Sequence, residues 1–199
     1  IDGFRAEVGK ELDAVIGSAK DALSRSHNEE SPMGNWMTDC LRDWGHADAA
    51  FQNAGGIRSE LDAGPITLRE IYEVMPFDNR VVLLRMGGAS LREVLENGVS
   101  GAHGRLQLSG VQAKIDAGAP AGHRVIEASI GGKPLDDKKQ YAVAATDFMT
   151  TGGDGYGAFS KAVRKEEKET LLRDVLTWCV KKDKTITTPK SGRIEKKKD

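Results

Sequence analysis

The sequence has little cysteine, no long apolar run and no excess of charge of either sign. Its two cysteines, Cys40 and Cys179, match no zinc-binding spacing and are too few for a disulfide framework, so the redox state of both stays open. No apolar run approaches the roughly 18 residues of a spanning helix. With 29 basic and 30 acidic residues, the net charge is −1. We therefore expect neither a membrane span nor a nucleic acid polymer as partner.

The motifs of a self-contained hydrolase are also missing. The four histidines are scattered without metal-ligand spacing, and there is no Gly-x-Ser-x-Gly elbow, Walker loop or Cys–His pairing. We therefore expect no metal, no cofactor and no catalytic residue in this chain. The chain is expected to hold a substrate and not to transform it.

Hydrophobic periodicity predicts the helices and strands. Helical spacing or a capping box predicts helices at residues 4–16, 33–44, 67–75, 90–99 and 169–182. Apolar or alternating runs predict strands at residues 47–52, 80–86, 106–116, 123–130 and 140–146. No repeat or linker divides them, so we expect one α+β domain with mixed β-sheets flanked by helices. The segment 184–199 reads as a polar, basic tail in solvent.

The segment NAGGIR at 53–58 is a candidate binding loop. Gly55 and Gly56 remove side chains, so backbone amides can approach a ligand. Asn53 offers an amide donor and acceptor, and Arg58 offers a planar fork for oxyanions. Taken alone, the hexapeptide is better explained as a chain reversal after a strand, with Arg58 at the surface.

A second candidate loop surrounds Asp154. Gly152 and Gly153 precede this carboxylate and another glycine follows it, which predicts an exposed tight turn suited to two ribose hydroxyls or to a cation. Phe77 and Phe148 each border one of the polar loops, where two rings could enclose a planar heterocycle. Core packing is the competing explanation for both phenylalanines.

Together, these segments resemble a known family. NAGGIR, a PF pair about two dozen residues later, DFMTTGGDGY and the upstream MGNWMTD are similar to the C-terminal domain of periplasmic and cell-surface 5′-nucleotidases. The resemblance implies that Phe77 and Phe148 stack on the two faces of the base and that Asp154 binds the ribose hydroxyls. It also implies that Asn53 and Arg58 contact the base edge and the ribose or phosphate side. Glycines 55, 56, 152 and 153 would shape the two loops.

The resemblance also implies a division of labour. Residues 1–20 would be an interdomain connecting helix, and residues 21–183 a substrate-binding domain that decides specificity. Two divalent metal ions and the catalytic Asp–His pair would belong to an N-terminal metallophosphoesterase domain absent from this chain. The isolated domain is expected to be inactive. The substrates would be 5′-nucleotides, nucleotide sugars or 2′,3′-cyclic nucleotides, and the location periplasmic, secreted or cell-surface.

Two alternative functions stay open, and the sequence departs from the family pattern at one point. The chain could be a non-catalytic cell-surface module for nucleotide binding or adhesion, or it could belong to a sulfur-substrate branch of the family, in which Phe77 and Phe148 would be superfluous. Family members often carry a phosphate-binding arginine near MGN, whereas this sequence offers only Arg25 and His27 at a distance. Tyr156 is expected to support its loop and not to contact a ligand.

Overall fold

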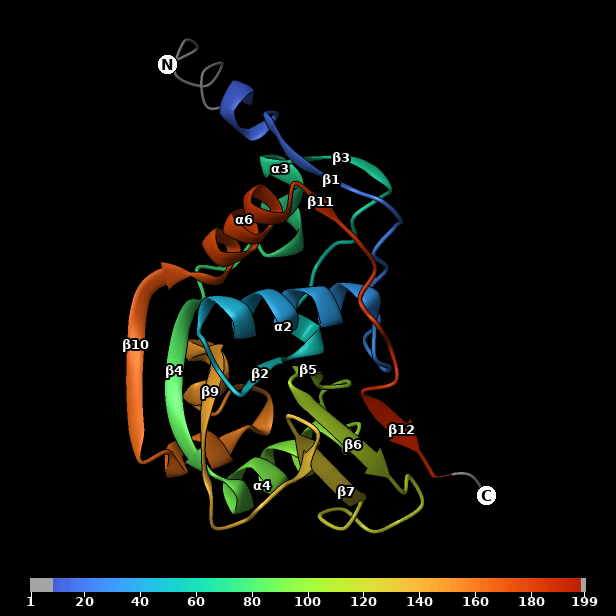
Figure 1. Ribbon diagram of the computed structural model, residues 1–199, viewed down its shortest axis with the longest axis vertical. Helices are drawn as coiled ribbons and strands as arrows, with labels where there is room; N and C mark the ends of the chain where they lie inside the picture. The colour runs from blue at the N-terminus through green and yellow to red at the C-terminus, as the bar shows by residue number, and fades with distance from the viewer. Residues whose placement is uncertain (1–8, 198–199) are drawn as a thin grey trace.

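The computed structural model describes residues 9–197. It contains three β-sheets with helices between and around them (Figure 1). The five-stranded sheet has the order β10-β4-β9-β2-β5, and within it β2 runs parallel to β9 while the other neighbours are antiparallel. Its strands are β2 (Ala49–Gln52), β4 (Arg80–Gly87), β5 (Gln107–Ser109), β9 (Gln140–Thr146) and β10 (Arg164–Leu171). The predicted α+β architecture with mixed sheets is confirmed.

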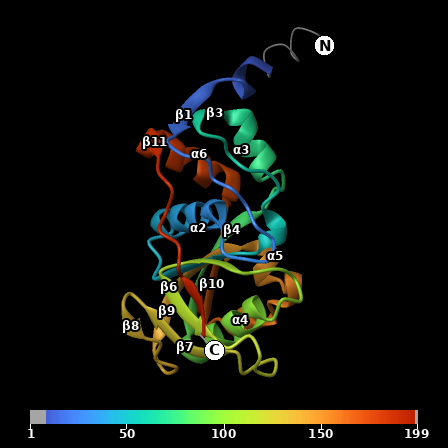
Figure 2. The same cartoon turned by 90° about the vertical axis from the view of Figure 1, so that its right-hand side faces the viewer.

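Two smaller sheets lie at opposite ends of the molecule (Figures 1 and 2). One has the order β11-β1-β3, with β1 (Val15–Ala19), β3 (Gly64–Thr67) and β11 (Thr185–Ile186). The other has the order β12-β6-β7-β8, with β6 (Val111–Ile115), β7 (Val125–Ile130), β8 (Lys133–Pro134) and β12 (Ile194–Lys196). The sequence predicted one strand over 106–116, but this segment forms two strands, β5 and β6. They are separate because Gly110, with φ +76°, turns the chain between them.

The helices agree with most of the predicted ones. They are α2 (Pro32–Trp44), α3 (Leu68–Val74), α4 (Gly88–Val99), α5 (Asp147–Thr150) and α6 (Leu172–Asp183), with three 3₁₀ turns, η1 (Ala54–Gly56), η2 (Gly153–Gly155) and η3 (Gly157–Lys161). The predicted start of the last helix at 169 is wrong, because β10 runs to Leu171 and pairs with β4. The capping box expected at 90–93 is also wrong, since α4 begins after Gly87 without a side-chain cap.

The five-stranded sheet separates two hydrophobic cores. Successive strand residues point to opposite faces, so Val143 and Ala145 join one core while Ala144 joins the other. The core that contains Ala144 also contains residues of helices α2, α3 and α6. The core that contains Val143 and Ala145 also contains residues of α4 and of the sheet with β6 and β7. The loops at the ends of β2 and β9 therefore rest on a buried scaffold.

The prediction of a connecting helix over residues 1–20 needs correction. Residues 9–12 are helical, but Val15 and Ile16 lie in β1, where an antiparallel partner, β3, replaces the helical hydrogen bonds. Residues 1–8 of that prediction lie outside the described part of the chain. Tertiary pairing here overrides a local apolar spacing that suits a helix.

The expectation of a solvated tail over residues 184–199 is likewise corrected, because the segment forms β11 and β12. Arg193 ties it down by an ion pair of 2.7 Å with Asp39 and a hydrogen bond of 2.7 Å to the carbonyl oxygen of Leu108. Figure 2 shows this segment running past α2 to β12, which pairs in parallel with β6. An arginine that is 15% exposed and paired is a structural anchor, not a free surface charge.

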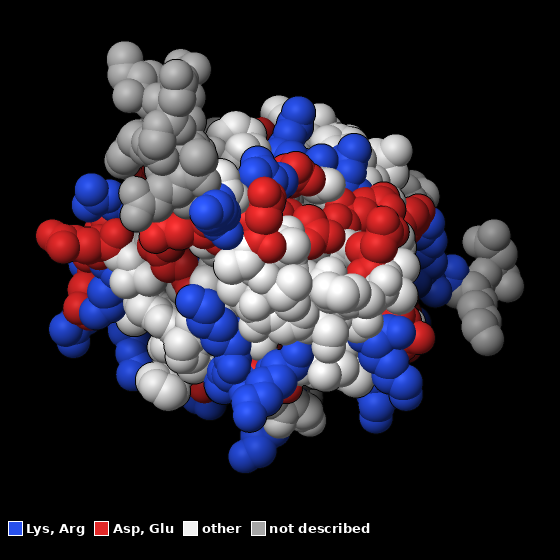
Figure 3. Space-filling model, turned by 90° about the horizontal axis from the view of Figure 1, so that it is seen from above, with Lys and Arg blue, Asp and Glu red and all other residues white. Residues whose placement is uncertain are grey.

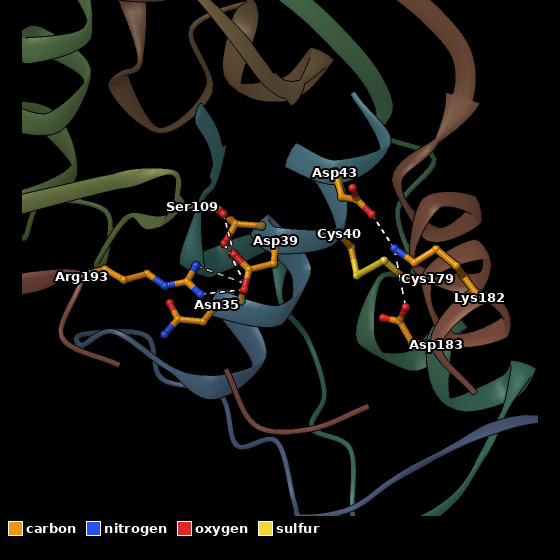
Figure 4. Close-up of a disulfide and its surroundings, with 10 residues drawn as sticks. Asn35, Asp39, Cys40, Asp43, Ser109, Cys179, Lys182, Asp183 and Arg193 are labelled. Carbon is orange, nitrogen blue, oxygen red and sulfur yellow. Dashed lines mark hydrogen bonds and ion pairs between the residues drawn. A yellow bond between two sulfur atoms is a disulfide. The ribbon is translucent and has the colours of Figure 1, made fainter. Parts of the chain in front are cut away.

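A disulfide joins α2 to α6. Cys40 and Cys179 are bonded, with their Cα atoms 5.9 Å apart and a sequence separation of 139. Figure 4 shows the bridge beside Lys182, which reaches both Asp43 and Asp183. The question that the two-cysteine count left open is thus answered by the fold.

Charges of both signs share the surface. Seen from above, acidic side chains form a band across the molecule and basic side chains line the lower rim (Figure 3). This mixture agrees with the net charge of −1.

The predicted capping box of α3 is confirmed. The Thr67 hydroxyl accepts from the Glu70 amide at 3.3 Å, and the Glu70 carboxylate accepts from the Thr67 amide at 2.7 Å.

We expect Thr67→Ala to lower the free energy of unfolding by about 1 kcal/mol in urea titrations, because the helix end loses this reciprocal pairing. The control is Thr188→Ala, an exposed threonine, which should change it by less than about 0.5 kcal/mol. An equal effect of both changes would contradict the assigned cap.

Candidate functional site

A pocket of about 240 Å³ brings the predicted residues together. It is lined by Asn53, Gly55, Gly56, Phe77, Asn79, Phe148 and Asp154. All of these except Asn79 were singled out from the sequence. The pocket lies where four segments meet: the loop after β2, the loop before β4, the start of α5 and the turn η2.

The floor of the pocket is a chain of polar side chains that leads to Asp154. Gln52 donates to the Asn53 side-chain oxygen at 2.9 Å, and the Asn53 amide nitrogen donates to the Asp154 carboxylate at 2.7 Å. Asn53 is 5% exposed, so its orientation is fixed by these two bonds. A Cβ at Gly56 would lie 2.3 Å from the Gln52 amide nitrogen, which explains the glycine there.

Asp154 sits at the tip of a strained turn. Its φ of +52° lies in the left-handed region, and the turn begins at Gly152 with φ +98°. The Asn97 side chain donates to the Asp154 carbonyl oxygen at 3.0 Å and holds this conformation. Among the described residues, only the Oδ2 atom of this carboxylate has a hydrogen-bond donor, so Oδ1 is left to accept from a ligand.

The side walls are two exposed phenylalanines. Phe77 is 44% exposed and Phe148 is 41% exposed, whereas the other two described phenylalanines, Phe51 and Phe159, are each 1% exposed. Core packing therefore explains the second pair and not the first. Large aromatic rings left in solvent beside a polar floor are typical of a site that stacks on a planar ligand.

The Phe148 ring and the Phe77 backbone are held from behind. A Cβ at Gly153 would lie 2.6 Å from the Phe148 ring, so that ring packs directly over the glycine. On the other wall, Arg173 of α6 donates to the Phe77 carbonyl oxygen at 3.2 Å and pairs with Asp78. The Phe148 ring and the Phe77 backbone are thus supported by the scaffold, while both side chains stay more than 40% exposed.

Three sequence candidates do not line the pocket. Gly152 and Gly153 shape the turn, and Arg58 is exposed at the end of the NAGGIR loop, where it donates to the Gly55 carbonyl oxygen at 3.3 Å. Tyr156 is 3% exposed in the core, as expected of a supporting residue. Burial, with the nearby Asp154 charge, raises the pKa of Tyr156 well above its ordinary value, so the phenol stays protonated.

Sequence reasoning missed Asn79. It lies two residues after Phe77 in the segment PFDN, and its amide donates to the Asp147 carboxylate at 3.1 Å. Its position beside an aromatic candidate in a polar turn was the available signal. No local pattern shows that it faces Asp147, because the two are 68 residues apart.

Larger hollows lie elsewhere but have a different character. One of about 600 Å³ lies over the sheet of β6 and β7, and one of about 540 Å³ lies beside β12; neither is lined by an aromatic ring. A third, of about 460 Å³, lies beside the disulfide, and its one aromatic lining residue, Trp36, is buried. Across residues 9–197, no three or more His, Cys, Asp and Glu side chains are grouped so that they could hold a metal ion. A search of the same residues finds no helix with the length and apolar character needed to cross a bilayer.

Comparisons with known proteins agree with this geometry. The family model described as 5′-nucleotidase, C-terminal domain, matches residues 15–161. The chain is 32% identical over 214 residues to the trifunctional nucleotide phosphoesterase protein YfkN of Bacillus subtilis strain 168, covering 98% of the chain and 15% of that protein. It is 31% identical over 180 residues to a snake venom 5′-nucleotidase of Macrovipera lebetinus, covering 77% of the chain and 43% of that protein.

A solved structure shares the fold. The 5′-nucleotidase precursor from Thermus thermophilus superposes with a TM-score of 0.90 at 31% identity, covering 98% of the chain and 41% of that structure. The chain thus spans less than half the length of each of these relatives.

Proposed function

Since the chain belongs to the family of 5′-nucleotidase C-terminal domains, we propose that it is the nucleoside-binding part of a phosphohydrolase that removes phosphate from nucleotides. The observation that supports this most is the pocket in which two exposed phenylalanines flank a carboxylate with a free oxygen. A flat, apolar base with a polar sugar attached fits that combination of groups. The same features disfavour the sulfur-substrate alternative, which has no use for two stacking rings.

Each group would have one task. Phe77 and Phe148 would stack on the two faces of the base, at about 1–3 kcal/mol per stacked base. The free oxygen of Asp154 would accept from the ribose hydroxyls. Asn53, fixed by its own hydrogen bonds, would present the remaining amide hydrogen or carbonyl lone pair to the base edge.

The phosphate side of the nucleotide would face the exposed arginines. Arg58 lies at the end of the NAGGIR loop, and Arg25 approaches the same loop, with its guanidinium 3.5 Å from the Ile57 carbonyl oxygen. Two cations that contact the NAGGIR loop would favour an anionic group beside that loop. Arg25 would thus take the place of the arginine that family members often carry near the MGN segment.

Hydrolysis would need groups from outside this chain. The two divalent metal ions expected in an N-terminal metallophosphoesterase domain would supply Lewis-acid activation of water. The residues of the pocket would bind and orient the nucleotide, which contributes by positioning. The isolated chain should therefore bind nucleosides without turning nucleotides over.

An extracytoplasmic location is part of this proposal. The disulfide between Cys40 and Cys179 favours an oxidising compartment, because such bonds are rare in reducing cytosol. The similarity to an enzyme of snake venom points the same way.

The ribose contact can be tested with a matched pair of ligands. We expect the chain to bind adenosine about tenfold more tightly than 2′,3′-dideoxyadenosine by calorimetry, because hydrogen bonds to a charged group contribute about 1.5–3 kcal/mol. Asp154→Asn should bind adenosine about as weakly as the wild-type chain binds the dideoxy compound. Asp62→Asn, at an exposed aspartate away from the pocket, is the control. Equal binding of the two ligands by the wild-type chain would contradict the role of Asp154.

A further inference from the structure

One hydrogen bond connects the two aromatic walls of the pocket. Asn79 lies two residues after Phe77, and Asp147 lies one residue before Phe148. The Asn79 amide donates to Asp147 Oδ1 at 3.1 Å, and the same oxygen accepts from the Phe148 backbone amide at 2.7 Å. The loop that carries one ring is thereby tied to the helix end that carries the other.

We propose that the Asn79–Asp147 pair sets the width of the gap between Phe77 and Phe148, so that Asp147 is a positioning residue for the planar base. This inference rests on the proposed nucleoside-binding function. It assigns a task to Asp147, which does not line the pocket, and to Asn79, which does.

Each partner of the bond is anchored on its own side. The carbonyl oxygen of Asn79 accepts from the Leu172 backbone amide at 2.9 Å at the start of α6. The carbonyl oxygen of Asp147 accepts from the Thr151 hydroxyl at 2.9 Å within the α5 turn. Each segment is therefore anchored at its own end, and the side-chain bond links the two segments directly beside the residues that carry the rings.

Packing fixes the gap between the rings only in part. The Phe148 ring packs over Gly153, but both rings are more than 40% exposed, so the width of the gap also depends on how the two segments that carry them are placed. Dispersion contact falls steeply when a gap widens by 0.5–1 Å, losing about a quarter to a half of its attraction. A base stacked between two rings is consequently sensitive to whatever sets their spacing.

The test compares three variants by calorimetric titration with adenosine. We expect Asp147→Ala to lower the affinity about fivefold, as for the loss of one net hydrogen bond, and Asp147→Asn to restore it to within about twofold, since its amide oxygen can still accept. Asp116→Ala is the matched control, because Asp116 also accepts from a nearby backbone amide and has one side-chain partner, Lys197, far from the pocket. It should leave the affinity unchanged.

Two further measurements separate positioning from a general loosening of the fold. In a Phe148→Ala background, Asp147→Ala should have less than about a twofold effect, because the ring that it positions is gone. Binding of ribose 5-phosphate, which has no base, should be the same in Asp147→Ala and the wild-type chain.

Equal adenosine affinity in Asp147→Ala and the wild-type chain would overturn the inference, and so would a fivefold loss that persists without the Phe148 ring. Failure of the wild-type chain to bind any nucleoside would instead overturn the proposed function. Circular dichroism of each variant confirms that it is folded.

Discussion

Replacing Phe77 and Phe148 together by alanine is expected to lower the affinity for adenosine by at least about 100-fold, since each stacked ring contributes about 1–3 kcal/mol. Each single change should cost about tenfold by the same reasoning. Because both side chains are more than 40% exposed, their removal leaves no cavity in either core. The thermal midpoint should therefore stay within a few degrees of that of the wild-type chain.

The control for this prediction is Trp178→Ala. Trp178 is an aromatic of similar exposure, 39%, on α6 away from the pocket, where Lys182 stacks on its ring. Its removal should leave adenosine binding unchanged in the same calorimetric assay. Unchanged affinity in the folded double phenylalanine variant would show that the exposed rings do not form the base site, and would favour a binding or adhesion module with another ligand.

Removing the disulfide is expected to destabilise the chain more than any of the other substitutions. The Cys40–Cys179 bond closes a loop of 139 residues and joins α2 to α6 inside one hydrophobic core. A loop of this length constrains the unfolded chain, and the two sulfurs are buried. We therefore expect removal of the bond to lower the free energy of unfolding by about 2–5 kcal/mol.

The measurement is guanidinium unfolding of the wild-type chain with and without dithiothreitol, beside the variant in which Cys40 and Cys179 are both replaced by serine. The midpoint of the wild-type chain should fall in the reductant and approach that of the variant, whereas the variant should not respond to the reductant. Coincident midpoints for oxidised and reduced wild-type chains would contradict a stabilising bridge.

Local chemistry made much of the fold predictable. The α3 cap was visible because Thr67 and Glu70 stand three residues apart. The end of α3 was visible because Pro76, two residues after its last residue, cannot continue a helix. The run at 80–86 was visible as a strand because β-branched and apolar residues suit a strand buried on both faces. At the α3 cap the partners are close neighbours in sequence, whereas the same spacing at Ser90 and Glu93 forms no cap because α4 begins after Gly87.

Long-range partners account for what the sequence did not reveal. Val15 and Ile16 keep a helical spacing but lie in a strand that pairs with β3, some 50 residues away. Arg193 reads as part of a solvated basic tail until Asp39 is placed beside it. Neither the helix pattern nor the charge run carries information about such a partner.

The pocket shows the same difference between local patterns, which the sequence reveals, and long-range contacts, which it does not. The carboxylate at Asp154 and the two aromatic walls were inferred from glycine-rich turns and from rings bordering polar loops. The link between Asn79 and Asp147 was not, because it joins two turns that are adjacent only after β4 pairs with β9. The sequence therefore indicates most of the residues that line the pocket, and the fold shows how the segments that carry them are linked.

The central claim is that the pocket between Phe77 and Phe148 binds a nucleoside, and NMR titration of the ¹⁵N-labelled chain with adenosine, AMP, uridine and UDP-glucose tests it most directly. Saturable amide shifts confined to residues 53–58, 77–79 and 147–156, absent with ribose alone, are the predicted result. Shifts centred on another region, such as the hollow over β6 and β7, would contradict it. So would the absence of shifts at ligand concentrations several times the dissociation constant, which we expect to be roughly millimolar for a weak site.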